Sequence, residues 1–205
     1  MVSLCITGTD DMRIILASAS PRRKHLLQQM GIEFDIITSN KEERIPQGLT
    51  FEEIPIELAY NKAIDVASRI CQPAIIIGAD TVVVKDGILG KPRDEEEACQ
   101  MLYRLQGQTH QVITGLALVN PGTGEVQKSY EKTLVKMEAL TLKEIECYVK
   151  TGEPMDKAGS YGIQGLAGIF ISGIEGCYFN VMGLPINLLW KMFKNFDFNI
   201  LDKGK

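Results

Sequence analysis

Short apolar runs alternate with amphipathic segments along most of this chain. Runs rich in Ile, Val and Leu, or alternating between apolar and polar residues, predict strands. These runs span residues 14–17, 34–38, 74–81, 82–84, 88–89, 111–119 and 126–137. Turn-forming residues at 85–87 and 121–124 join neighbouring runs, so we expect two hairpins. Hairpin strands are antiparallel, so the sheet should be mixed.

Helical patterns fill the intervals between the predicted strands. They run over residues 21–30, 55–69, 94–105, 141–151 and 185–196. Thr50 with Glu53, and Thr141 with Glu144, have the spacing of a capping box, which favours a helix start. Alternating strands and helices predict an α/β fold, and no Gly/Pro/Ser-rich linker divides it.

The segment from Ile14 to Arg23 places donor groups where a helix begins. Ser20 suits the N-cap and Pro21 the first helical position, while Gly31 can close the helix. Unpaired backbone N–H groups at a helix start favour an anion, and Arg22 and Arg23 add planar forks that match phosphate. The segment predicts a phosphate cradle. The alternative is a solvated first turn that happens to be basic.

A second cluster follows the apolar run at 74–79. Asp80 and Thr81 come at what the pattern indicates is the carboxyl end of a strand, where open α/β sheets place ligands. Asp80 can hold a divalent cation or take a proton from water; the alternative is a turn or cap aspartate. In a third segment, residues 156–165, glycines allow the backbone to approach a ligand closely.

Charge and composition narrow the classes of partner. The formal net charge of −4 indicates no broad basic surface for nucleic acid. The five cysteines form no CxxC pair and the chain has two histidines, which argues against structural zinc and a disulfide scaffold and fits a reducing cytoplasm. No signal peptide or membrane-spanning run is evident. At 205 residues and 45% hydrophobic content, one core is expected, with two lobes as an option.

Six pieces of the sequence, in order, resemble the Maf family of nucleoside triphosphate pyrophosphatases. The pieces are SASPRR, the lysine of AYNKA, GADTVV, GKP, QTHQVITG and DKAGSYGIQG. The resemblance covers residues 12–196, and DKAGSYGIQG is similar to the branch acting on dTTP and UTP. It implies an elongated α/β fold, similar to inosine-triphosphate pyrophosphatases, with a nucleotide cleft between two lobes. Residues 12–205 would form the domain, and residues 1–11 an extension.

The resemblance implies that water attacks the α-phosphorus and releases a monophosphate and pyrophosphate. Asp80 is then the proton acceptor, and Asp80 and Glu43 hold Mg²⁺ or Mn²⁺. Substrate phosphates are expected to meet hydroxyl and cationic side chains, and the base is expected to meet Thr81 and Gln164 alongside Arg22. The phosphate-binding set is Ser18, Ser20, Arg22, Arg23, Lys62 and Lys91.

Several of these assignments have plainer alternatives. Without the resemblance, Lys62 fits an exposed helix face, Lys91 is undecided, and Glu43 and Gln164 fit solvated loops. The expected partner is a nucleoside triphosphate, with modified pyrimidine triphosphates as runner-up substrates and a homodimer as an open option. Nucleic acid and membrane are not expected, and the expected location is the cytoplasm. The competing function is a nucleotide-binding regulator of division or septum formation that does not hydrolyse.

Overall fold

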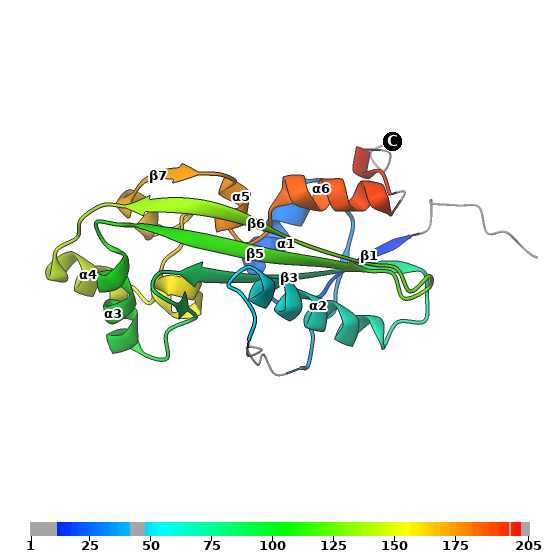
Figure 1. Ribbon diagram of the computed structural model, residues 1–205, viewed down its shortest axis with the longest axis horizontal. Coiled ribbons are helices and arrows are strands. Elements are labelled where there is room, and N and C mark those ends of the chain that lie inside the picture. Colours follow the sequence, from blue (N-terminus) through cyan, green and yellow to red (C-terminus); the bar gives the residue numbers. More distant parts are fainter. Residues whose placement is uncertain (1–11, 42–47, 197, 202–205) are drawn as a thin grey trace, which may run out of the picture.

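One mixed sheet runs through the whole length of an elongated molecule (Figure 1). The computed structural model describes residues 12–41, 48–196 and 198–201, so the expected extension at 1–11 and Glu43 lie outside the described residues. Within these ranges the strands follow the order β2-β1-β3-β5-β6-β7, and β4 pairs with β3. The strands are β1 Arg13–Leu16, β2 Asp35–Ile36, β3 Ala74–Val84, β4 Ile88–Leu89, β5 Thr109–Val119, β6 Val126–Met137 and β7 Ile171–Glu175.

Helices cover both faces of the sheet. They are α1 Pro21–Gln29, α2 Glu53–Ala67, α3 Glu95–Leu105, α4 Leu142–Val149, α5 Tyr178–Val181 and α6 Ile186–Asn195. Three 3₁₀ turns, η2 Glu153–Asp156, η3 Ala158–Ser160 and η4 Leu166–Phe170, occupy the glycine-rich region. No helix among the described residues is both long and apolar enough to cross a membrane.

The hydrophobic core divides between the two ends of the sheet. In one lobe, α1 and α6 pack on one face through Leu27 and Phe193, and α2 packs on the opposite face through Ala63. In the other lobe, α3 and α4 enclose a separate cluster that includes Leu102 and Val149 (Figure 1). The mixed α/β architecture with two lobes, expected from the sequence, is confirmed.

Both expected hairpins and both capping boxes are present. β3 and β4 are antiparallel, and Asp86 and Gly87 take positive φ in their turn. The Thr141 hydroxyl accepts the Glu144 backbone N–H, and the Glu144 carboxylate accepts the Thr141 backbone N–H. Thr50 and Glu53 do the same, although α2 begins at Glu53, before the predicted Pro55. The strand predicted over residues 34–38 was too long, since only Asp35 and Ile36 pair with β1.

The expectation that a strand ends at Asp80 and Thr81 was wrong. β3 continues to Val84, and its partner β5 pairs with it continuously from Ile76 to Val84. This partner holds the chain extended through Asp80, which the local sequence alone does not reveal. On its other edge, β3 pairs with β1 as far as Ile77 and with β4 only from Val83. The result is an opening in the sheet beside Asp80 and Thr81.

Two glycines bring α2 against the backbone of the sheet. A Cβ atom at Gly78 would collide with the carbonyl oxygen of Ala59, and one at Gly115 would collide with the backbone of Pro55. Bare backbone at both positions therefore lets the helix approach more closely than any side chain would allow. This approach positions Lys62 of α2 next to β3.

Candidate functional site

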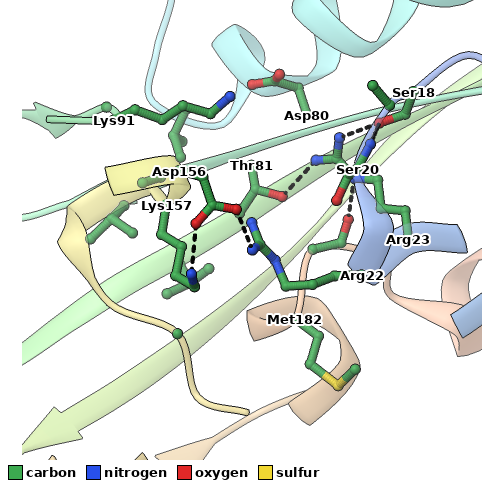
Figure 2. Close-up of a pocket in the computed structure, with 18 of the residues that line it drawn as sticks. Ser18, Ser20, Arg22, Arg23, Asp80, Thr81, Lys91, Asp156, Lys157 and Met182 are labelled. Atoms are coloured by element: carbon green, nitrogen blue, oxygen red, sulfur yellow. Dashed lines mark hydrogen bonds and ion pairs between the residues drawn. The ribbon is translucent and has the colours of Figure 1, made fainter. Parts of the chain in front are cut away.

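A cavity of about 600 Å³ lies at the opening in the sheet, between the two lobes. Its walls come from the loop after β1, the start of α1, the middle of β3, the loop after β4, the glycine-rich region and the residues after α5 (Figure 2). All eight expected substrate-binding residues and the expected proton acceptor line it. They are Ser18, Ser20, Arg22, Arg23, Lys62, Thr81, Lys91, Gln164 and Asp80.

Asp80 and Thr81 enter this cavity from opposite faces of β3. Side chains alternate along a strand, and the missing neighbour strand at this point leaves space on both faces. Figure 2 shows the Asp80 carboxylate and the Thr81 hydroxyl directed to different parts of the cavity. A ligand that spans the opening can therefore meet a carboxylate at one end and a hydroxyl at the other.

Lys62 forms an ion pair with Asp80. Its Nζ lies 2.5 Å from Oδ1, and the two side chains are 14% and 11% exposed, respectively. The exposed-face alternative for Lys62 is therefore wrong, because the close approach of α2 turns this residue inward. Among the described residues, Asp80 makes no other hydrogen bond, so its second carboxylate oxygen remains for a ligand or water.

The loop between β1 and α1 is held by Ser18. The Ser18 hydroxyl accepts the Ser20 backbone N–H at 3.2 Å and an Arg23 N–H at 3.1 Å. Ser20 occupies the predicted N-cap position, but its side chain makes no capping hydrogen bond. Ser20 lines the cavity at a helix start, where unpaired backbone N–H groups favour an anion.

The two arginines of α1 differ in their surroundings. Arg23 is buried, and its nitrogens donate to the Gly183 carbonyl, the Ser18 hydroxyl and the Thr81 hydroxyl. Arg22 is half-buried and crosses the cavity to Asp156, with 3.1 Å between its guanidinium and the carboxylate. Arg23 thus joins three segments of the cavity wall, while Arg22 extends into the cavity (Figure 2).

Asp156 and Lys157 are site residues that the sequence reasoning missed. Burial raises the pKa of Asp156, but the hydrogen bond and charge of Lys157, with the charge of Arg22, hold that pKa below its usual range. Lys157 Nζ lies 2.6 Å from Asp156 and also donates to the Glu153 carbonyl. Both residues begin the motif DKAGSYGIQG. From this motif, the sequence predicts the glycines and Gln164 as ligand contacts, but not the charged side chains of Asp156 and Lys157.

Lys91 and Gln164 are exposed residues that line the cavity. Figure 2 shows the Lys91 side chain extending toward the Asp80 carboxylate. The loop before Lys91 is fixed to the glycine-rich region, because Gly159 N–H donates to Gly90 O at 3.0 Å. Gln164 has no hydrogen bond within the part of the chain that the structure describes, so its amide is open to a ligand.

The cavity is strongly cationic. Among the described lining residues, six cationic side chains face two carboxylates, those of Asp80 and Asp156. The cations are Arg22, Arg23, Lys41, Lys62, Lys91 and Lys157. Lys41 is a further residue that the sequence reasoning did not select. An excess of positive charge in a cleft of an acidic protein fits a polyanion such as a triphosphate.

A buried histidine forms a hydrogen bond with a residue of the cavity wall. His110 Nε2 lies 2.6 Å from the hydroxyl of Tyr161, which lines the cavity. Burial, with a smaller contribution from Lys85, lowers the pKa of His110 to about 4. His110 therefore remains neutral in the folded protein at pH values where it becomes protonated in the unfolded chain.

This difference predicts an acid-sensitive fold. Above about pH 6.5 His110 is mostly neutral in both the folded and the unfolded protein, so it costs little stability. As the pH falls from about 6.5 toward 4, the unfolded chain binds a proton at His110 and the folded protein does not, so the unfolding free energy decreases. Between pH 7 and pH 5 we expect His110 to account for about 2 kcal/mol of lost unfolding free energy. Urea unfolding at both pH values should show a smaller loss in His110→Gln. The matched control, exposed His25→Gln, should retain the wild-type loss, and an equal loss in all three proteins would contradict the assignment.

The family model and the sequence relatives agree on one family. A family model described as "Maf-like protein" matches residues 13–196. The "dTTP/UTP pyrophosphatase" of Alkaliphilus oremlandii is 50% identical over 92% of this chain and 99% of its own length. The protein of the same name from Clostridium perfringens is 47% identical over 93% and 100%. Among solved structures, a nucleoside-triphosphatase (dITP/XTP pyrophosphatase) from Mycobacterium abscessus matches with a TM-score of 0.39 and 17% identity, covering 63% of this chain and 76% of that chain.

Proposed function

The chain belongs to the Maf family, and on that basis we infer that it is a nucleoside triphosphate pyrophosphatase that hydrolyses dTTP and UTP. Water attacks the α-phosphorus, the α–β phosphoanhydride breaks, and the products are the nucleoside monophosphate and pyrophosphate. One observation carries this conclusion: relatives named for that activity align along their whole length with a chain whose cationic cavity faces a buried carboxylate.

We propose that Asp80 is the proton acceptor for the attacking water. Its Oδ1 is held by Lys62, which fixes the orientation of the carboxylate, and its other oxygen remains for the water. A general base must lie within hydrogen-bond reach of the proton that it takes. Asp80 lines the cavity, with Lys62 paired to it and Lys91 extending toward it, which supports this role.

The phosphates are proposed to bind between the start of α1 and the lysines on the opposite wall. Ser18, Ser20 and the N-terminus of α1 provide donors, and Arg22 provides a planar fork. Lys62, Lys91 and Lys157 face the same space, where they can neutralise charge that develops on the leaving pyrophosphate. Arg23 contributes its charge and also fixes Ser18, to which it donates a hydrogen bond.

The site also fits a divalent cation held jointly by protein and substrate. The described residues contain no group of three or more His, Cys, Asp or Glu side chains that would form a metal cage. Mg²⁺ and Mn²⁺ commonly bind through one or two carboxylates plus substrate phosphates, and Asp80 supplies such a carboxylate. We propose Asp80 and Glu43 as the protein ligands. The ion would neutralise phosphate charge when bound.

Isotope labelling in a substrate panel tests the reaction. The purified chain is incubated in H₂¹⁸O with each common ribonucleoside and deoxyribonucleoside triphosphate and a divalent cation. UTP and dTTP should give monophosphate and pyrophosphate, with the label in the monophosphate because water attacks the α-phosphorus. Label in inorganic phosphate or pyrophosphate would contradict the assigned bond. Binding without product would favour the non-hydrolysing regulator.

Gln164 is proposed to read the base together with Thr81. The amide of glutamine can both donate and accept, so it can match the edge of uracil or thymine. Gln164 is exposed in the free protein, but once a base covers it the amide mismatched against cytosine loses its partner, at about 1–3 kcal/mol. We therefore expect Gln164→Ala to narrow the UTP/CTP ratio of kcat/KM by about 5- to 150-fold while hydrolysis continues. Gln100→Ala, on the exposed side of α3, is the control and should retain the ratio. A full ratio in Gln164→Ala would remove Gln164 from base recognition.

A further inference from the structure

The hydroxyl of Thr81 is held by two other side chains before any substrate binds. Arg23 lies 3.1 Å from Thr81 Oγ1, and the hydroxyl of Thr114, the opposite residue on β5, lies at 2.9 Å. Thr114 is fully buried and does not line the cavity. Whether the Thr81 hydroxyl donates or accepts a hydrogen bond toward a ligand therefore depends on Thr114, a residue that no substrate can contact.

The directions of these hydrogen bonds follow from the groups involved. Thr114 Oγ1 lies 3.1 Å from the backbone carbonyl of Asn180, which can only accept, so Thr114 donates its single proton there. Thr81 must then donate its own proton to Thr114. Arg23 can only donate, so it occupies one lone pair of the Thr81 oxygen. A single lone pair remains, and Thr81 can only accept a hydrogen bond from a ligand.

This polarity is locked by a closed ring of hydrogen bonds. The Asn180 carbonyl also accepts the Gly183 N–H at 2.9 Å, and the Gly183 carbonyl accepts Arg23 Nε at 2.8 Å. Asn180 itself is buried and fixed to β5, because its side-chain amide donates to the Val112 carbonyl at 2.9 Å. The Asn180 carbonyl thus sets the direction of the bond between Thr81 and Thr114, and the donor-only guanidinium of Arg23 sets the direction of the other bond to Thr81.

We propose that Thr114 is the residue that sets substrate specificity indirectly, by forcing Thr81 to act as an acceptor toward the base. The proposal rests on the pyrimidine preference inferred above. Uracil and thymine carry an N–H at ring position 3, which an acceptor matches. Cytosine carries a lone pair there, so two acceptors would face each other. A free threonine hydroxyl could rotate and donate to cytosine, and Thr114 prevents that rotation.

The test compares two substitutions at Thr114. Thr114→Val keeps the shape but removes the acceptor for the Thr81 proton, whereas Thr114→Ser keeps the hydroxyl. We expect the UTP/CTP ratio of kcat/KM to fall at least about fivefold in Thr114→Val, with CTP hydrolysis undiminished or faster, and to stay within about twofold in Thr114→Ser. Thr114→Ala makes the same prediction and serves if the valine variant does not fold.

A double-mutant cycle separates this role from a merely structural one. In a Thr81→Val background, Thr114→Val should leave the remaining UTP/CTP ratio unchanged, since the hydroxyl that it controls is gone. A wild-type ratio in folded Thr114→Val, or an equal loss toward both substrates, would overturn the proposal and leave the proposed function intact. A wild-type protein that hydrolyses UTP and CTP alike would overturn the proposed substrate preference itself.

Discussion

Asp80→Asn should fold normally but turn over UTP about 10²–10⁴-fold more slowly, the usual cost of losing a general base. Asparagine preserves the shape of the side chain and can still lie beside Lys62, but it has neither the charge nor the basicity of the carboxylate. The measurement is kcat at saturating UTP and divalent cation, with circular dichroism to verify the fold.

The matched control is Asp86→Asn in the β3–β4 turn. Asp86 has a positive φ, which asparagine tolerates, and it lies outside the cavity. Its variant should keep wild-type turnover. Near-native kcat in Asp80→Asn would eliminate Asp80 as the essential base. Recovery of its activity by raised metal concentration would assign the residue to metal binding instead.

Arg22→Ala should lower kcat/KM for UTP by about 10- to 150-fold, the range for losing a hydrogen bond to a charged group. The loss should exceed that of one charge, because Asp156 loses one of its two cationic partners and keeps only Lys157, so that its carboxylate repels phosphate more strongly. Arg22→Lys should recover little, since lysine keeps the charge but not the planar fork. Steady-state kinetics at fixed ionic strength measure the effect.

Arg93→Ala is the control for Arg22, because Arg93 is exposed and paired with Glu97 away from the cavity. Calorimetric titration with UTP and with UMP adds a second comparison. If Arg22 contacts the phosphates, the alanine substitution should weaken UTP binding more than UMP binding. Unchanged affinity and turnover would place Arg22 outside the substrate site.

Local sequence patterns predicted those elements whose structure is determined by residues close together in the sequence. The capping box at Thr141, the positive-φ turn at Gly87 and the long alternating strand at 126–137 are all set by residues close in sequence. The helix start at Ser20 was also correct. In each case the relevant hydrogen bonds or turn conformations form within a few residues, so a short window contains the information.

Features that depend on distant partners could not be predicted in this way. β3 continues past Asp80 because β5 pairs with it, and Lys62 turns inward because Gly115 on that same strand admits α2. Arg22 meets Asp156, which lies 134 positions away in the chain. The family resemblance supplied the list of site residues, but neither this pairing nor the hydrogen-bond polarity at Thr81.

The two glycines that contact α2 show that residues outside the cavity can determine the geometry of the proposed active site. Gly78 and Gly115 carry no chemistry and do not line the cavity, yet their lack of a side chain determines how far Lys62 lies from Asp80. Anyone redesigning this enzyme for another triphosphate is freer to alter exposed Gln164, whose neighbours are solvent and ligand, than either glycine. The geometry of the proposed catalytic pair, Lys62 and Asp80, therefore depends on two residues without side chains, Gly78 and Gly115, that contact the backbone of α2.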